Sequence, residues 1–509
     1  MEPQLAAPEA PDESEILPRL ARVAIAALGV LVIGAWLFLA LVHLGDHYNV
    51  NAVSGTLLAL ADRARDGVLY PPFFDGQSYG GTRTMPLPIL LYGFAMSMGG
   101  DIVASAKLVD FAAAAGLVLL LIAILRRQGA GMVLSVALAS TVVSSQVFLL
   151  TGAGIRPEAL PTVLQLGAVA LVAFVPRRAA VVVAGVLCAI ALFAKLTALW
   201  APAAIALWLL SRDRGRMALF VAVTAVAAAA LAGLFVVASE GRMLTNLLGL
   251  GGAGISIVGI AKAPLKAVQL LLQHAQAGLV LLPLLLGSLF VGRAARPSIF
   301  TLGFLAAGVI LLVVMADLGS DYNHLLDVVV LLPIVAHESI RSLARRMPDP
   351  RPAWAFLAGA LLVGSATALA MNAGSTLAAA IGLPGTSTTT YDPRLLAGDL
   401  GGAPSVLAED PYFDLARGAR PVVLDAFMLI RLERRDAALV EPLLARLETG
   451  GFDAVVLTRD LDEPGAEGWY RDFAFGSRFY DAARAGYRRC AFRGGLYLYA
   501  PSSRPCPAT

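Results

Sequence analysis

Long apolar stretches separated by short arginine-rich connectors make up most of the chain before residue 373. Of the 509 residues, 58% are hydrophobic and only 15% are charged, whereas about a quarter of the residues in an ordinary soluble domain carry a charge. A helix crosses a bilayer with about 20 apolar residues, and a membrane β-barrel would instead alternate polar and apolar residues. The sequence therefore predicts a polytopic α-helical membrane protein.

The arginine clusters predict the orientation, because cytoplasmic connectors are enriched in arginine and lysine. Working outward from them gives roughly eleven transmembrane helices, a cytoplasmic N-terminus and an extracytoplasmic C-terminus in the cell membrane. The clusters are Arg126-Arg127, Arg177-Arg178, Arg212 to Arg216, Arg293 to Arg296, and Arg341 to Arg351. The predicted spans lie near 23–44, 104–125, 131–151, 158–175, 179–194, 196–211, 217–238, 277–292, 298–316, 323–340 and 353–372.

Three regions follow from this pattern. Residues 1–19, rich in Pro, Ala and acids, are expected to be a disordered cytoplasmic tail. Residues 20–372 form the expected transmembrane domain, whose first outer loop, 45–103, contains a helix over 86–99 that we expect along the membrane surface. Residues 373–509 are expected to form an extracytoplasmic α/β domain.

The expected elements of the C-terminal domain come from local patterns. The runs 421–424 and 452–457 resemble strands, and 437–448 has leucines spaced for one buried helix face. The segments 488–492 and 496–499, separated by two glycines, predict a hairpin. Cys490 and Cys506, unlike Cys188 in its apolar run, could form a disulfide in an oxidising compartment.

Two aspartates of the first outer loop are candidate catalytic groups. Asp46 directly follows the first predicted span, so its carboxylate would lie at the lipid boundary, where it could accept a proton from an attacking hydroxyl. The alternative is a solvated acid at a helix end. Asp75 is a second candidate, for which the alternative is an ordinary turn aspartate.

Cations on the expected outer side are candidate phosphate ligands. Arg156, in Arg156-Pro157-Glu158, departs from the cytoplasmic bias of the other arginines, and a guanidinium matches phosphate geometry. Pairing with Glu158 or a lipid headgroup is the alternative. Lys195 lies between two apolar stretches, which is typical either of a polar cavity or of a lysine that extends to the interface. Tyr322, Asn323 and His324 begin a late span and could line a cleft or cap that helix.

Several function classes lack their sequence signatures. The five histidines show no metal-ligand spacing such as HExxH, and there is no CxxC, Walker A sequence or GxGxxG before a helix. The net charge of +3, with basic residues at helix ends, argues against a nucleic acid partner.

The first outer loop carries three short motifs: the acid after the first span, Gly67-Val68-Leu69-Tyr70-Pro71-Pro72, and Met85-Pro86-Leu87-Pro88. Together they resemble the first outer loop of GT-C membrane glycosyltransferases, in particular the protein mannosyltransferase and aminoarabinose transferase group. Further along, that superfamily often carries polar residues at the positions of Arg156-Pro157-Glu158, Lys195-Leu196-Thr197 and the segment 322–326.

The resemblance implies an inverting transferase that uses a polyprenyl-phosphate sugar, with a glycan, lipid or protein as acceptor and membrane lipids around it. It implies that a first-loop aspartate is the base and that outer basic residues hold the phosphate; His47 follows Asp46 where many relatives have a second acid, which leaves the base and any divalent metal open. The resulting assignment is catalytic Asp46 and Asp75, phosphate-binding Arg156, Lys195 and Arg83, and a cleft of His47, Glu158, Tyr322, Asn323 and His324.

Three other classes share parts of this pattern: a secondary transporter, a flippase or ligase for lipid-linked sugars, and an inactive scaffold. Against a transporter, the sequence shows no two-half repeat and gathers its polar residues on one side.

Overall fold

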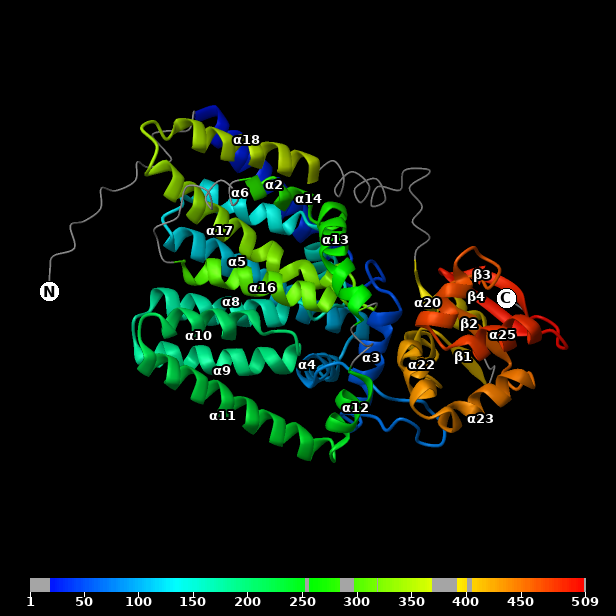
Figure 1. Ribbon diagram of the computed structural model, residues 1–509. Helices are drawn as coiled ribbons and strands as arrows, with labels where there is room; N and C mark the ends of the chain where they lie inside the picture. Colours follow the sequence, from blue (N-terminus) through cyan, green and yellow to red (C-terminus); the bar gives the residue numbers. More distant parts are fainter. Residues whose placement is uncertain are drawn as a thin grey trace.

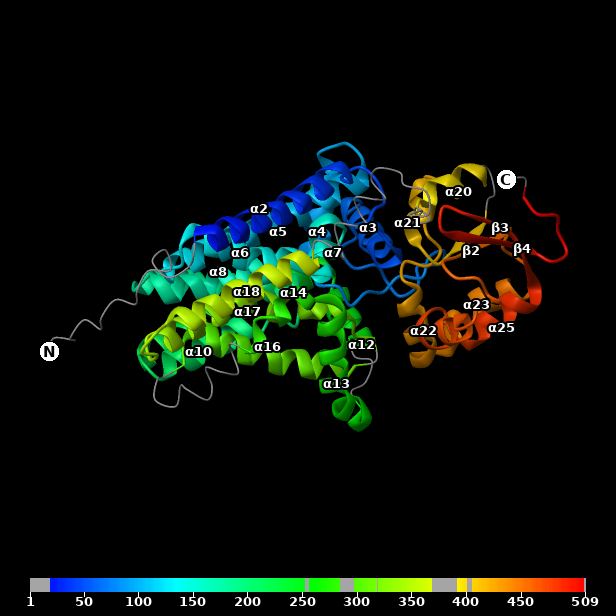
Figure 2. The same cartoon turned by 90° about the horizontal axis from the view of Figure 1, so that it is seen from above.

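The computed structural model describes residues 19–251, 256–283, 297–317, 319–368, 391–400 and 405–507. A long helical bundle carries a smaller C-terminal domain at one end, here called the domain-bearing end (Figures 1 and 2). The predicted tail, the loop after residue 368 and the cluster Arg293 to Arg296 fall largely or wholly outside the described residues.

The bundle consists of helices whose apolar residues point outward as well as inward. In the outermost helix α11, Val226 and Val237 are 70% and 78% exposed, whereas Trp36 and Leu121 in the interior are almost fully buried. A helix that is apolar all round suits a lipid environment. The bundle helices are α2 (Arg19–Val42), α5 (Ile102–Arg127), α6 (Met132–Val143), α7 (Gln146–Ala153), α8 (Ala159–Phe174), α9 (Arg178–Ala194), α10 (Trp200–Leu210), α11 (Arg214–Ala238), α16 (Ile299–Met315), α17 (Leu326–Ala344) and α18 (Arg351–Ala368).

Most of the predicted spans coincide with described helices, but 131–151 is not one straight helix. It is divided into α6 and α7, which are bent by 83° at Ser144 and Ser145. The Ser145 hydroxyl accepts the Phe148 N–H and so starts a new helix instead of continuing the old one. Among the described helices, α2, α5 and α11 are both long and apolar enough to cross a membrane by themselves, and α6 with α7 makes a fourth candidate.

The described arginine-rich connectors all lie at the end of the bundle opposite the C-terminal domain (Figures 1 and 2). They are the turns that follow α5, α8, α10 and α17. The two ends of the bundle therefore differ in chemistry.

Short helices cover the domain-bearing end. The helix predicted over 86–99 is present as α4, whose first turn contains Pro86 and Pro88. Helix α13 runs across the ends of the bundle helices (Figure 1). The helical segments at this end are α3 (Ala52–Arg65), α4 (Pro86–Ser97), α12 (Arg242–Leu250), α13 (Ile257–His274), α14 (Gln276–Leu279) and the 3-10 turn η1 (Tyr322–Leu325).

The C-terminal domain is a four-stranded sheet between two layers of helices. Its strand order is β1-β2-β4-β3, with β1 and β2 parallel and the other pairs antiparallel. Alternate residues face opposite layers, so Leu407 and Val455 pack with α22, α23 and α25 while Val406 and Val456 pack with α20 and α21. The elements are α20 (Pro393–Asp399), β1 (Val406–Ala408), α21 (Pro411–Ala416), α22 (Ala426–Arg435), α23 (Ala437–Glu448), β2 (Ala454–Leu457), α24 (Ala466–Gly468), the π-helical turn η3 (Trp469–Phe473), α25 (Ser477–Gly486), β3 (Tyr487–Arg493) and β4 (Leu496–Pro501).

The predicted helix over 437–448 and the predicted hairpin are confirmed as α23 and as β3 with β4, and Cys490 is disulfide-bonded to Cys506. The strand prediction for 421–424 is wrong. This segment lies outside the sheet and pairs instead with the first loop, since the Tyr79 N–H donates to Val422 O (2.7 Å) and the Leu424 N–H donates to Tyr79 O (2.9 Å). The segment pairs through its backbone as a strand would, but its partner, Tyr79, is distant in sequence.

The C-terminal domain docks on the bundle through α21, which packs against α3. Gly55 of α3 faces Asp410, the N-cap of α21, and a Cβ at Gly55 would lie 3.1 Å from Tyr412 Cβ and collide with the Asp410 carboxylate. Asp410 also accepts the Tyr391 hydroxyl and the Tyr412 N–H. A side chain larger than hydrogen therefore does not fit at Gly55.

We expect Gly55→Ala to loosen this docking by about 1–3 kcal/mol, because α21 must shift away from α3. Thermal unfolding in detergent would show a lower Tm, and limited proteolysis would cut the first loop sooner. Gly34→Ala in α2 is the matched control, since no described atom lies within 4 Å of its added Cβ. Equal Tm values for the two variants would contradict this packing.

Burial raises the pKa of Asp410 to about 7, against the opposing hydrogen bonds from Tyr391 and Tyr412. A carboxyl whose pKa is raised on folding stabilises the fold fully below its unfolded pKa of about 4, and that contribution is lost as the pH rises through 7. We expect the Tm of the wild type minus that of Asp410→Asn to fall as the pH rises from about 4 to about 7, the interval between the unfolded and the folded pKa. A difference that grows with pH would show that the carboxylate form stabilises the docking.

Candidate functional site

Asp46 lies in a tight turn after α2. Its carboxylate is 2.5 Å from His43 Nδ1, accepts the Tyr48 N–H at 2.9 Å, and is 3.7 Å from Lys107 Nζ. The Asp46 side chain is 44% exposed, whereas that of Lys107 is only 2% exposed. The carboxylate is thus held in place from one side and open on the other.

Lys107 and Asp110 lie one turn apart on α5 and link this turn to Arg156. Lys107 Nζ donates to the carbonyls of His43 (2.7 Å) and Tyr48 (2.8 Å). Asp110 accepts the Tyr92 hydroxyl (2.7 Å) and the Arg156 N–H (2.7 Å). Asp46 and Arg156 therefore contact successive turns of α5, Asp46 through Lys107 and Arg156 through Asp110.

Glu158, Asn323 and Lys195 meet although they are distant in sequence. The Asn323 amide donates to Glu158 Oε1 at 2.6 Å, and Lys195 Nζ is 3.9 Å from the same oxygen. Lys195 ends α9 in an extended conformation, which directs the chain into α10. Arg156 donates to Asn51 at 3.1 Å, and its Nε is buried without a hydrogen-bond partner in the described part of the chain.

His324 lies in η1, the turn that precedes α17 outside the spanning helices. Burial, together with the positive charges of Lys195, Arg83 and Lys266, holds the pKa of His324 well below its usual range. Lys266 of α13 donates to Ser320 O (2.7 Å) and Ser320 Oγ (3.0 Å) beside this turn. Positive charges from three segments therefore act on one histidine. We call Arg83, Lys195 and Lys266 the cation group.

Arg83 connects this group to the C-terminal domain. Its guanidinium lies 4.8 Å from the ring centre of Phe427 in α22, and Arg431 lies 5.2 Å from the same ring. Burial raises the pKa of Asp425, the N-cap of α22, to about 6, and the Arg83 charge opposes that rise. Neither Arg83 nor Lys195 donates a hydrogen bond to any residue that the structure describes, so both keep N–H groups for a ligand.

Three other predicted residues lie outside the cation group. Asp75 accepts the N–H groups of Gln77 and Ser78 and pairs with Arg420; burial raises its pKa, but these contacts outweigh burial and lower it. Buried His47 packs on the Tyr412 ring at the docking interface, where burial lowers its pKa. Tyr322 stacks on His274 at 4.1 Å, next to the cation group.

The structure thus brings together Arg83, Lys195, Glu158, Asn323 and His324, and it leaves Asp46 and Asp75 in two separate clusters. Sequence reasoning missed Lys107, Asp110 and Lys266. Lys107 and Asp110 carried a visible signal, since two opposite charges one turn apart inside a predicted span need a polar partner. Lys266 lay in a predicted outer loop without a distinctive pattern.

Within the described ranges, no three His, Cys, Asp or Glu side chains gather closely enough to hold a metal ion.

Solved structures with similar folds are known. The chain resembles ArnT from Cupriavidus metallidurans bound to undecaprenyl phosphate, with a TM-score of 0.55 and 12% identity over 94% of this chain and 99% of that one. It also resembles the apo oligosaccharyltransferase of Archaeoglobus fulgidus, with a TM-score of 0.53 and 11% identity over 96% of this chain and 75% of that one. No protein-family model matches the sequence, and no curated protein matches it significantly.

Both similar proteins belong to the GT-C superfamily of membrane glycosyltransferases, so the predicted resemblance is confirmed at the level of the fold. The chain therefore has the fold of these two proteins, and three of its described helices are long and apolar enough to cross a membrane.

Lys107→Met should destabilise the turn that holds Asp46 by about 2–4 kcal/mol, because two buried carbonyls lose their donor. Thermal unfolding in detergent measures this as a lowered Tm. Lys262→Met is the matched control on the exposed face of α13, where we expect a change within about 0.5 kcal/mol. If both substitutions leave the Tm unchanged, Lys107 does not hold the turn.

Proposed function

We propose that this protein is a glycosyltransferase that moves a hexose or pentose from a polyprenyl-phosphate carrier to an acceptor hydroxyl, with inversion at the anomeric carbon. The observation that carries the proposal is the cation group beside His324, in which Arg83 and Lys195 retain unused donors. The GT-C fold supports it, as does the undecaprenyl phosphate bound to the similar ArnT structure. Guanidinium and ammonium groups are the usual ligands of phosphate.

The reaction needs a base and a stabilised leaving group. The acceptor oxygen forms a bond to the anomeric carbon as the bond from that carbon to the phosphate oxygen breaks, and the electron pair leaves with the polyprenyl phosphate. Asp46 takes the hydroxyl proton. Arg83 and Lys195, with Arg156 at the edge, stabilise the phosphate charge that develops. Because the donor is already activated, no nucleotide hydrolysis is required.

Asp46 and Glu158 are the two candidate bases, and the experiment below distinguishes between them. Asp46 is the more exposed carboxylate, but it belongs to the His43 and Lys107 cluster. Glu158 touches the cation group through Lys195, yet it is buried and bound to Asn323. Asp75 is tied to Arg420 and to two backbone N–H groups, so we assign it to holding the first loop against the C-terminal domain.

We propose the domain-bearing end as the extracytoplasmic side of a cell membrane, with the N-terminus in the cytoplasm. The arginine-rich turns at the opposite end support this orientation, and so does the disulfide between Cys490 and Cys506. The acceptor is then an envelope glycan, lipid or protein. A transporter would need a polar path through the bundle from one end to the other, whereas the residues of the candidate site gather at the domain-bearing end.

Asp46→Asn should lower kcat by at least about a hundredfold, because general base catalysis commonly contributes that much. The double variant Arg83→Ala, Lys195→Ala should instead weaken donor binding and slow transfer. The measurement is sugar transfer in proteoliposomes, using a panel of undecaprenyl-phosphate hexoses and pentoses with membrane extract as the acceptor source.

The matched controls are Asp462→Asn and Arg478→Ala, exposed charges on the C-terminal domain that pair with Arg484 and Glu441. Both should keep wild-type transfer. Full activity in Asp46→Asn together with loss of activity in Glu158→Gln would move the base to Glu158. Transfer that survives in all of these variants, or its absence from the wild type, would overturn the proposed function.

A further inference from the structure

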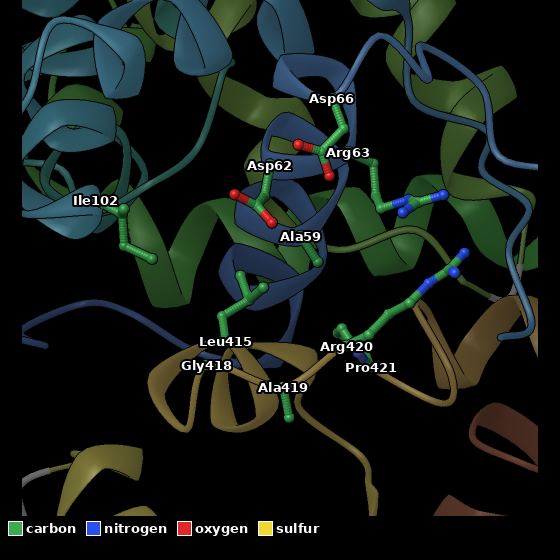
Figure 3. A pocket seen from close by; sticks show the side chains of 10 residues that line it. All are labelled: Ala59, Asp62, Arg63, Asp66, Ile102, Leu415, Gly418, Ala419, Arg420 and Pro421. Atoms are coloured by element: carbon green, nitrogen blue, oxygen red, sulfur yellow. The ribbon is translucent and has the colours of Figure 1, made fainter. Parts of the chain in front are cut away.

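A cleft of about 380 Å³ lies where α3 faces the segment that follows α21. Figure 3 shows the charged side chains that line it: Asp62 and Arg63 from α3, Asp66 from the C-cap of that helix, and Arg420 from the facing segment. Asp66 is four positions from Asp62 and three from Arg63, so all three side chains lie near one face at the end of this helix. The cleft lies apart from the cation group, and its volume is in the range of small-molecule sites, about 300–1,000 Å³.

The charges of the cleft are balanced. Arg420 is paired with Asp75, and Asp62 is 3.2 Å from Arg65. After these two ion pairs, the Arg63 guanidinium and the Asp66 carboxylate remain available to a ligand. Within the described residues Arg63 Nε is buried and has no hydrogen-bond partner. A buried donor without a partner is costly, so this atom is suited to a ligand that supplies an acceptor.

The remaining wall of the cleft is apolar or small. Ile102 and Leu415 contribute aliphatic surface, and Pro421 and Ala419 complete the facing segment. A sugar ring combines hydroxyl groups, which both donate and accept hydrogen bonds, with C–H faces that pack on such surface. Arg63 can donate hydrogen bonds and Asp66 can accept them, so the two side chains together suit a neutral ligand.

We propose that this cleft binds a neutral saccharide portion of the acceptor, with Arg63 and Asp66 hydrogen-bonding to its hydroxyl groups. The inference rests on the proposed function and adds to it the acceptor class and the acceptor-binding residues. A phosphate group fits the cleft poorly, because the carboxylates of Asp62 and Asp66 would repel it. The donor phosphate is assigned to the cation group, so donor and acceptor occupy different places at the domain-bearing end.

The cysteine content of the chain allows a direct binding test on the full-length protein. Cys188 is buried and the other two cysteines form the disulfide, so Ala419→Cys introduces one accessible thiol into the cleft. The probe is the neutral oligosaccharide fraction released from the envelope of the producing cells. At about ten times its Kd, the probe should slow labelling by an uncharged maleimide about tenfold.

Ala445→Cys is the matched control, since this alanine is exposed on α23 and does not line the cleft. Its labelling rate should not change with the probe. If the neutral fraction leaves both rates unchanged, or if only an acidic fraction or polyprenyl phosphate protects Ala419→Cys, the assignment of the cleft is overturned.

Transfer kinetics separate this inference from the proposed function. In Arg63→Gln and Asp66→Asn, the acceptor concentration at half-maximal transfer should rise about tenfold, while the donor dependence and kcat stay near wild type. Transfer with an unchanged acceptor dependence would overturn the cleft and leave the glycosyltransferase intact. Protection of Ala419→Cys without any transfer would leave a saccharide site and overturn the proposed function.

Discussion

The cost of placing charge in hydrocarbon divides this molecule into two chemically different ends. At one end, arginines lie in the short turns between helices and belong to no candidate site. At the other end, acidic, amide and basic side chains from segments distant in sequence lie close together. Lys107 and Asp110 show what the constraint requires, because each enters the bundle only with buried partners: two carbonyls for the lysine, a tyrosine hydroxyl and an N–H for the aspartate. The residues that we propose to bind or react therefore lie at the domain-bearing end.

The C-terminal domain completes that polar end. The Tyr79 backbone pairs with the segment before α22, α21 fits against α3 only because Gly55 has no side chain, and Phe427 lies between Arg83 and Arg431. The first loop is therefore fixed between bundle and domain. A cation held on an aromatic face keeps its N–H groups free, which is the state that a phosphate ligand needs.

The lengths of the apolar stretches and the positions of the arginine clusters predicted most of the helices and the polar end. They did so because a helix in lipid needs an apolar stretch of a certain length and keeps its charges near its ends. The leucines of 437–448 likewise fixed α23. Contacts between distant segments could not be predicted: 421–424 has the composition of a strand, but its partner is Tyr79. Ser144 ends α6 and Ser145 caps α7 inside one apolar run. For the site, Lys195 was identified as a lone charge between apolar stretches, and Arg83 as one cation of the polar first loop. Their meeting at His324, and the separation of Asp46 from them, depend on the packing of five segments.

The most direct test of the account is the structure of the full-length protein in a lipid nanodisc with undecaprenyl phosphate, determined by cryo-electron microscopy. We expect the phosphate at the domain-bearing end, within hydrogen-bond distance of Arg83 and Lys195, with the prenyl chain leaving between bundle helices. A phosphate bound at the arginine-rich end, or at a distance from both side chains, would contradict it.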